Sequence, residues 1–474
     1  MIVLAKETKI REREGIYWMR SSHTASAVSV SFDEANLVSC AGLVPLLRLT
    51  ETIGLAELIT DRVDLGIPAG ANTAAKALSI VAGMAAGADS IDDLDLIRHS
   101  GTSRLFTGIR APSTCGTWLR GFTHGHTRQL ASATAEALLR LTTRVPRLVA
   151  GTDGLAFLDI DAKIKEIYGH RKHGGGYAYT HVYSLNHLIA TLSSPISPPV
   201  ILTAGLRKGN TDSRHGAVAM LREAITLARR AGATGMIVVR ADSAFFTGPI
   251  ITAIRDAGAY FSITAQKNAA TQTAINAIAE HDWQPIAYQR PIFDPATGEW
   301  LTHGEIAETT LTAFTNPTYN PGRAVTARLL IRRTPHLVPD EQGELFRVWY
   351  YHAVFTDTRF PLRTADEHHR GHAIIEQVFA DLNDSALAHY PSGRFAANQA
   401  WLTLAVLTHN LLRAAGALTS VFHAKARTGT LRRQLITVPA RITRSARRIT
   451  LRLPAGWPWQ AAYQGLFAAT HRSA

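Results

Sequence analysis

The spacing of apolar and polar residues changes character several times along the 474-residue chain. Residues 28–146 repeat apolar positions every three or four residues, as in Leu55–Ile59, which is the spacing of a helix with one apolar face. Pro146 ends this pattern, because proline cannot continue a helix. We therefore predict a helical N-terminal domain at 28–146, preceded by a disordered tail at 1–27.

Strand patterns replace the helical pattern from about residue 147. Leu155–Asp161 is predicted as a strand that carries Asp159 and Asp161 on the same face, since side chains alternate along a strand. After a short turn, Ile164–Tyr168 is predicted as a second strand, and Tyr177–Leu188 as a third extended stretch. The short connections indicate that these three strands are antiparallel neighbours.

Strand–helix–strand units complete the region up to residue 267. The apolar run Met236–Val239 predicts a buried strand that ends near Asp242, and Tyr260–Thr264 predicts another strand. Three antiparallel strands followed by such units favour an α/β fold with a ribonuclease-H-like mixed sheet over a doubly wound sheet. We assign 147–267 to the first part of this core.

The remaining chain divides into three further regions. Short strand-like runs separated by Pro, Gly, Asn and Asp predict a β-rich insertion at 268–357. The last part of the core is predicted at 358–415, beginning with an amphipathic helix at Arg370–Leu382 and continuing with a long apolar helix. A basic C-terminal region follows at 416–474.

The distribution of charge points to a polyanionic partner. The formal net charge is +13, and residues 385–474 contain no Asp or Glu but twelve of the 50 Lys and Arg residues. A solvated tail or a segment that binds acidic membranes has the same charge pattern. Aromatic residues beside the cations and a strand-like alternation at Arg448–Leu453 favour a folded segment that binds nucleic acid. Arg432, Arg433, Arg447 and Arg448 are its candidate DNA contacts.

Three acids stand in contexts that suit a catalytic site, and each also has an ordinary structural explanation. Asp242 at a strand end can face a crevice or cap the next helix. Asp159 and Asp161 can be site ligands or turn acids at a strand end. Glu376 lies on the polar flank of its helix, where it can reach the sheet or only solvent.

A second candidate DNA contact lies in the helical region. Ala111–Phe122 can open a recognition helix in which Ser113 or Thr114 caps the first turn. Thr117 and Arg120 would then face a DNA groove, and the domain at 28–146 would be a DNA-binding domain. The simpler interpretation is a capped surface helix, and both stay open here.

Together these segments resemble the DDE transposases of bacterial insertion sequences, and most of all the insertion-sequence family numbered thirteen-eighty. Four segments carry the resemblance: Leu158–Asp161, Ile167–His170, Val239–Phe246 and Ile375–Phe379. The resemblance implies a ribonuclease-H-like core with a β-insertion before the last acid, two divalent ions (Mg²⁺ or Mn²⁺), and cutting and joining of DNA at element ends. It also implies that Asp161, Asp242 and Glu376 are the catalytic, metal-binding triad, with Asp159 as a possible alternative first acid.

The chain departs from the family pattern around these acids. Relatives carry Tyr, Arg and Lys at offsets −7, −4 and +7 from the glutamate, where this chain has His369, His372 and Asn383. The DNA contacts of those positions are therefore not carried over to this chain, and Arg370 is a candidate substitute. After the first acid, Ala162-Lys163 stands where relatives often have Ser-Thr.

The expected partner is double-stranded DNA, namely the terminal inverted repeats of the element and the target, bound by a homodimer. Two widely separated cysteines and the absence of an 18-residue apolar run predict a cytoplasmic, nucleoid-associated protein without a membrane partner. Two other function classes remain: a non-catalytic DNA-binding protein, such as a decayed transposase, and a carboxylate-pair hydrolase such as a glycosidase.

Overall fold

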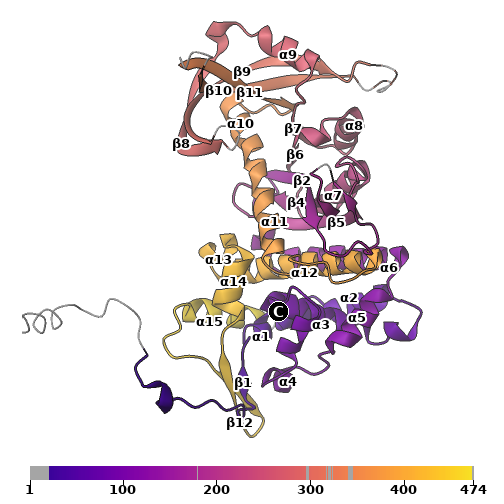
Figure 1. The fold of residues 1–474 in the computed structure, drawn as a ribbon, viewed down its shortest axis with the longest axis vertical. Helices are drawn as coiled ribbons and strands as arrows, with labels where there is room; N and C mark the ends of the chain where they lie inside the picture. Colours follow the sequence, from indigo (N-terminus) through magenta and orange to yellow (C-terminus); the bar gives the residue numbers. More distant parts are fainter. Residues whose placement is uncertain are drawn as a thin grey trace, which may run out of the picture.

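The computed structural model describes residues 21–178, 180–294, 298–316, 318, 322, 324–339 and 345–471. Most of the predicted disordered tail at 1–27 lies outside these residues. Figure 1 shows an elongated molecule with a helical layer at one end, a mixed sheet in the middle and a β-rich extension at the other end. None of the described helices is long and apolar enough to cross a lipid bilayer.

The first part of the chain is helical, as its apolar spacing predicted. Its longest helix, α6, begins at a capping box in which Thr123 and His126 satisfy each other's backbone N–H groups, and it ends before Pro146. The helices of this part are α1 (Leu43–Thr52), α2 (Leu55–Arg62), α3 (Thr73–Ala86), α4 (Thr102–Leu105), α5 (Pro112–Arg120) and α6 (His124–Arg144).

The central sheet combines antiparallel and parallel strands. β5, β4 and β2 are antiparallel neighbours, and β2, β6 and β7 are parallel neighbours. Helix α7 connects β5 to β6, and helix α8 connects β6 to β7. A short edge strand, β3, pairs with β4. The bounds are β2 (Leu155–Glu166), β3 (Gly176–Tyr177), β4 (Tyr183–Ser193), β5 (Val200–Lys208), α7 (Ala217–Arg230), β6 (Met236–Ala241), α8 (Gly248–Asp256) and β7 (Tyr260–Thr264).

The predicted turn after Asp161 is absent, because β2 is one continuous strand from Leu155 to Glu166. Its polar face continues past Asp161 with Lys163 and Lys165, which are held by side chains of a facing helix. These contacts give the second half of the strand partners that local sequence does not reveal.

The β-rich insertion extends the core sheet. Strand β11 pairs with β7 in antiparallel fashion, so the strands of the insertion and of the core form one ten-stranded sheet. A helix that the sequence pattern did not predict, α9, begins after Asn268, whose side chain caps it. The bounds are α9 (Ala269–Asn276), β8 (Gln284–Asp294), β9 (Glu299–Ala313), β10 (Val325–Pro339) and β11 (Leu345–Thr356).

The predicted helix Arg370–Leu382 is two helices, α10 (Leu362–Arg370) and α11 (Ile374–Asn383), joined by a 3₁₀ turn at Gly371–Ala373. Gly371 allows the close approach of Arg240 from β6, since a Cβ atom there would lie 2.6 Å from its Nη1. The helix therefore breaks where the sheet's arginine meets it. The predicted apolar stripe of α11 is buried at Ile375, Val378, Phe379 and Leu382.

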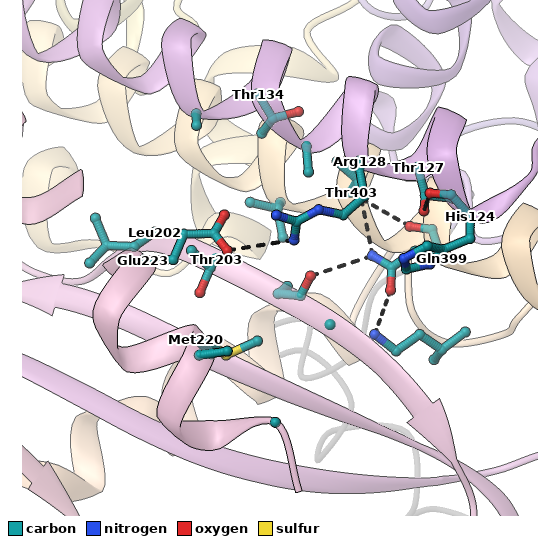
Figure 2. A pocket seen from close by; sticks show the side chains of 18 of the residues that line it. His124, Thr127, Arg128, Thr134, Leu202, Thr203, Met220, Glu223, Gln399 and Thr403 are labelled. Carbon is teal, nitrogen blue, oxygen red and sulfur yellow. Dashed lines mark hydrogen bonds and ion pairs between the residues drawn. The ribbon is translucent and has the colours of Figure 1, made fainter. Parts of the chain in front are cut away.

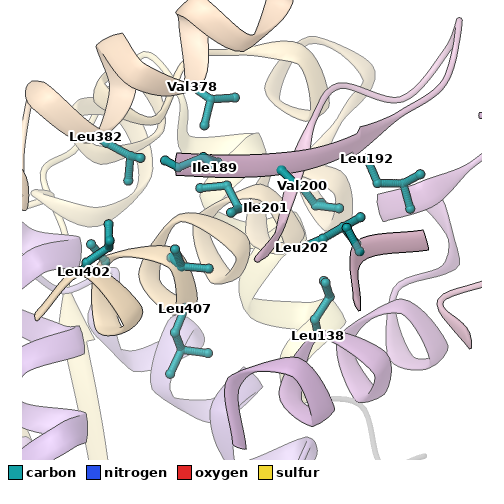
Figure 3. Packing of buried hydrophobic residues seen from close by; sticks show 14 of the residues in the cluster. Leu138, Ile189, Leu192, Val200, Ile201, Leu202, Val378, Leu382, Leu402 and Leu407 are labelled. Atoms are coloured by element: carbon teal, nitrogen blue, oxygen red, sulfur yellow. The ribbon is translucent and has the colours of Figure 1, made fainter. Parts of the chain in front are cut away.

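A long buried helix, α12 (Phe395–Thr419), joins the helical layer to the sheet. Asn410 pairs with both backbone groups of Ile201 in β5, at 2.9 and 2.8 Å. In Figure 3, apolar side chains of α6, α11 and α12 meet those of β4 and β5 in one core. Each such buried Leu or Ile stabilises the fold by roughly 1.5–3 kcal/mol, so the two layers hold each other.

The basic C-terminal region is folded against the beginning of the chain. Strand β12 pairs with β1 (Leu37–Val38), and the Tyr463 hydroxyl donates to the Ala41 carbonyl at 3.0 Å. The strand expected at Arg448–Leu453 is present as β13. The bounds are α13 (Val421–Lys425), α14 (Thr428–Leu431), a π-helical turn (Arg432–Ile436), β12 (Ala440–Ser445), β13 (Arg448–Arg452) and α15 (Gln460–His471).

Candidate active site

Asp159 is fully buried in β2 and belongs to a closed ion-pair network. Arg240 of β6 donates from Nε and Nη2 to its two carboxylate oxygens, both at 2.7 Å, and His372 Nδ1 lies 3.0 Å from Oδ1. Arg240 also donates to the His368 carbonyl at 2.5 Å and stacks on the Phe157 ring. This network ties two strands to the α10–α11 junction and leaves Asp159 no exposed oxygen.

The charges in this network shift the pKa values of its members. Burial raises the pKa of Asp159, but the charge of Arg240 and hydrogen bonds from His372 and Arg240 outweigh it, so the pKa lies below its ordinary value. Burial lowers the pKa of His372, yet Asp159 and Asp161 raise it above its ordinary value. The network therefore holds a carboxylate and favours an imidazolium beside it.

Asp161 lies in the middle of β2, and Asp242 directly follows the last residue of the neighbouring strand β6. The parallel register pairs Asp159 with Arg240, which brings Asp161 and Asp242, two residues further along each strand, to the same level. Both line one pocket of about 550 Å³. Asp242 also caps the 3₁₀ turn Ser243–Phe245, because its carboxylate accepts from the Ala244 N–H at 2.9 Å. Both interpretations of Asp242 therefore hold at once.

The two carboxyl groups are poorly solvated and repel each other's charge. Burial, together with the charges of Asp242 and Glu376, raises the pKa of Asp161 to about 6. Burial likewise raises the pKa of Asp242. A cation between them would relieve both effects, since an opposite charge favours the ionised form.

A buried arginine shapes the opposite wall of this pocket. Arg207 of β5 donates to Asn186 Oδ1 at 2.8 Å and to three carbonyls of the following loop. That loop contributes Asp212 to the pocket lining, where it is paired with Arg214 at 2.6 Å. Sequence reasoning missed Arg207 and Arg240, although an arginine inside an apolar strand signals a buried partner.

Glu376 stands on α11 outside the lining of this pocket. Its side chain is 57% exposed, and its Oε2 lies 3.1 Å from Lys163 Nζ of β2. Among the residues that the structure describes, no three His, Cys, Asp or Glu side chains are gathered as a metal-binding group. The structure thus brings Asp161 and Asp242 together and leaves Glu376 near them, held by a lysine.

Helix α11 runs along the polar face of β2, and the positions that depart from the family pattern meet there. Asp159 contacts His372, Lys163 contacts Glu376, and Lys165 Nζ lies 3.3 Å from Asn383 Oδ1. The two lysines on this face come from the strand, and His372 adds a positive charge from the α10–α11 junction.

The two other flanking residues have structural partners. His369 is buried between Ser262 and Thr264, at 3.0 Å from each hydroxyl, and burial lowers its pKa to about 3. It therefore stays neutral and holds β7. Arg370 donates to Asp366 at 2.8 Å.

The candidate recognition helix exists as α5, but its start differs from the prediction. Ala111 is the N-cap and Pro112 occupies the first turn, so neither Ser113 nor Thr114 caps it. Thr117 and Arg120 are exposed and contact each other at 3.1 Å.

The four candidate arginines of the C-terminal region differ in exposure. Arg433, Arg447 and Arg448 are exposed. Arg432 is only 13% exposed, packs near Gly87 and lies 3.7 Å from Asp384. Burial lowers its pKa, and Arg432 offers a DNA partner less surface than the other three arginines.

A second pocket, of about 340 Å³, lies between α6, α7, α12 and β5, and none of the candidate site residues lines it. Figure 2 shows Arg128 reaching towards Glu223 across it, an ion pair of 3.6 Å, with Gln399 on one wall. Gln399 accepts from the Leu206 N–H at 2.6 Å. This pocket lies between the helical layer and the sheet, and none of the candidate acids lines it.

Comparison with known proteins places the chain in a family. No curated protein matches it. A family model does match, over residues 20–474, and its description is transposase DDE domain group 1. Because this match spans nearly the whole sequence, the chain belongs to the DDE-domain transposases of that group.

Proposed function

We propose that the protein is a metal-dependent DNA transposase that binds the inverted repeats of its element and cuts and joins DNA strands by phosphoryl transfer. The observation that carries this is the pair Asp161 and Asp242, which line one pocket where β6 ends beside the middle of its parallel neighbour β2. Three antiparallel strands followed by two parallel crossovers support a ribonuclease-H-like core. The match to the insertion-sequence family numbered thirteen-eighty remains part of this proposal.

The donor set of this pocket fits hard divalent cations. Mg²⁺ and Mn²⁺ prefer carboxylate oxygens and retain waters. Both aspartates have raised pKa values, and a bound cation would lower them by stabilising the ionised carboxylates. Asp161, Asp242 and Glu376 would hold two such ions. When bound, the ions would supply charge stabilisation at the attacking and leaving oxygens of the phosphoryl transfer.

The contacts support Asp161 over Asp159 as the first ligand. Both oxygens of Asp159 are already occupied by Arg240 and His372, whereas Asp161 faces the pocket. Asp159 is a positioning residue that fixes α11 relative to β2. Glu376 joins the aspartates after its side chain leaves Lys163, a step of small cost because this ion pair is exposed.

The direct test is cleavage of duplexes that carry the inverted repeats flanking the gene. We expect strand cuts at the element ends with Mg²⁺ or Mn²⁺, and no cuts when EDTA is present. A non-catalytic DNA-binding protein would bind the same duplexes and leave them intact. A carboxylate-pair hydrolase using Asp159 is disfavoured because Arg240 holds both of its oxygens.

Bringing two element ends together is the reason to propose a homodimer. Sedimentation with and without the end duplexes would measure this, with two protomers expected on paired ends. A single protomer on each isolated end would contradict it.

DNA affinity is expected to fall steeply with salt, through the exposed cations of the C-terminal region. Neutralising Arg433, Arg447 and Arg448 together to Ala should reduce the slope of log K against log salt by roughly one unit for each phosphate that the chain no longer neutralises. Binding should weaken on any duplex, which titration at several salt concentrations would measure. An unchanged slope would refute phosphate binding by these residues.

Helix α5 is proposed as a groove-reading element on the strength of its exposed Thr117 and Arg120. The double variant Thr117→Ala with Arg120→Ala should bind element ends about tenfold more weakly and random duplex equally well. Competition binding with the two duplexes measures the ratio. Equal losses on both, or no loss, would make α5 an ordinary surface helix.

A further inference from the structure

The antiparallel pair β12–β13 is a ribbon with one anchored face. Ile442 and Leu451 stand opposite each other and pack, with Val38 and Ala41, into a small apolar cluster near the start of the chain. Strand β12 is also hydrogen-bonded to β1. A two-residue connection, Ala446-Arg447, closes the far end, which is exposed. The base of the ribbon is therefore fixed and its tip projects, as Figure 1 shows at the lower end of the molecule.

The opposite face of the ribbon is entirely polar and basic. Because side chains alternate, residues two apart from each other share this face. The register pairs them across the strands as Arg441 with Arg452, Thr443 with Thr450, and Ser445 with Arg448. All of these six side chains are exposed except the half-buried Thr443. We call these six residues the polar face.

This face carries unbalanced positive charge. Arg441 and Arg452 stand directly opposite each other, an arrangement of like charges that destabilises a strand pair. Among the described residues only Glu34 pairs with any of the six, at 3.0 Å from Arg441. Arg444 and Arg447 add two further exposed cations near the tip. An anionic partner would screen the repulsion between these arginines and would itself be attracted to them.

We propose that the polar face of β12–β13 enters the major groove of duplex DNA and reads base edges there. This inference rests on the proposed function and deepens it by assigning sequence recognition to a surface remote from the catalytic acids. The major groove admits a two-stranded ribbon, and the right-handed twist of such a ribbon follows the groove.

The residue types of the face suit base recognition. Arg448 and Arg452 present planar forks that match the O6 and N7 atoms of guanine, and Thr443 and Thr450 offer hydroxyls and methyl groups to neighbouring bases. A surface that only neutralises phosphates needs charge and no fixed fork. Arginines alternate with short hydroxyl side chains on a ribbon whose base is fixed. This arrangement therefore favours recognition of base edges over neutralisation of phosphates alone.

The test is selection from a random 30-bp duplex library by the full-length protein and by the double variant Arg448→Lys with Arg452→Lys. Lysine keeps the charge and loses the bidentate fork. We expect the wild-type chain to enrich a motif, and the variant to lose preference at two or more adjacent base pairs by roughly tenfold each. Affinity for unselected duplex and its salt slope should change little, because the charge is retained.

Two controls separate this result from other causes. Arg222→Lys, at an exposed arginine on α7, should enrich the wild-type motif. The second control uses the wild-type protein alone. Its binding should protect guanine N7 atoms within the motif from methylation, since these atoms lie in the major groove.

An unchanged motif in the lysine variant, or N7 atoms that remain reactive, would overturn the inference. So would a wild-type chain that enriches no motif. Metal-dependent cleavage of element ends is measured separately. If the wild-type chain cleaves element ends but its ribbon reads no bases, the proposed function stands and this inference fails. If the chain enriches a motif but does not cleave, this inference stands and the proposed function fails.

Discussion

Asp161→Asn and Asp242→Asn are each expected to reduce strand cleavage by about three orders of magnitude or more. Both substitutions keep the size of the side chain and remove the charge that a divalent ion needs. The fold should persist, because a raised pKa means that the folded state disfavours the ionised carboxylate. Asn also caps a helical turn as well as Asp does, which preserves the contact of Asp242 with Ala244.

The loss of cleavage is measured on duplexes that carry the element ends, in Mg²⁺. The loss of metal binding is measured by calorimetric titration with Mn²⁺. DNA binding should survive or tighten, since a negative charge leaves the path of the phosphates. The matched control is Asp212→Asn, a third aspartate of the same pocket that is neutralised by Arg214. It should retain most of the activity. Full cleavage by Asp242→Asn would overturn the two-metal proposal.

Glu376→Gln tests the third ligand separately. We expect the same loss of cleavage, with DNA binding retained. Full activity would instead direct attention to Glu367, which is exposed on α10. Asp381 is a weaker substitute, because Arg427 and the Thr428 N–H already hold its carboxylate at 3.0 and 3.2 Å.

Local sequence patterns predicted the elements whose start, end and type are determined by residues within the element itself. The strand at Tyr260–Thr264 and the end of α6 before Pro146 were found where expected, because apolar runs, proline and glycine act within a few residues. The turn expected after Asp161 was wrong for the opposite reason. Its polar successors Lys163 and Lys165 are held by α11, more than 200 positions away in the sequence.

The break at Gly371 has the same kind of cause. The amphipathic pattern runs through this glycine, and the approach of Arg240 from the sheet, which accompanies the break, has no local signal. Asp159 and Asp161 are equivalent by strand alternation, so the choice between them depends on where that arginine lies. The union of the insertion with the core sheet through β7 and β11 is likewise a long-range pairing that carries no local signal.

Asp159→Asn is expected to destabilise the protein by roughly 3–5 kcal/mol, because it leaves Arg240 buried without its counter-ion. Arg240 is 3% exposed and Asp159 is fully buried, so water cannot replace the missing charge. The substitution also leaves His372 a neutral amide oxygen in place of a carboxylate and puts an NH2 group against a donor of the network, which weakens the attachment of α11 to β2. A lower thermal midpoint and loss of cleavage should appear together, unlike the behaviour expected of Asp161→Asn.

The comparison that isolates the ion pair is the double variant Asp159→Leu with Arg240→Met. Replacing both charges by apolar groups of similar volume removes the unpaired ion. The double variant should therefore have a thermal midpoint closer to that of the wild-type protein than to that of Asp159→Asn. Asp212→Asn breaks an exposed ion pair and should shift stability by less than about 1 kcal/mol. If Asp159→Asn melts with the wild-type protein and only its cleavage fails, Asp159 acts on the chemistry directly, and the assignment of Asp161 as the first metal ligand has to be reversed.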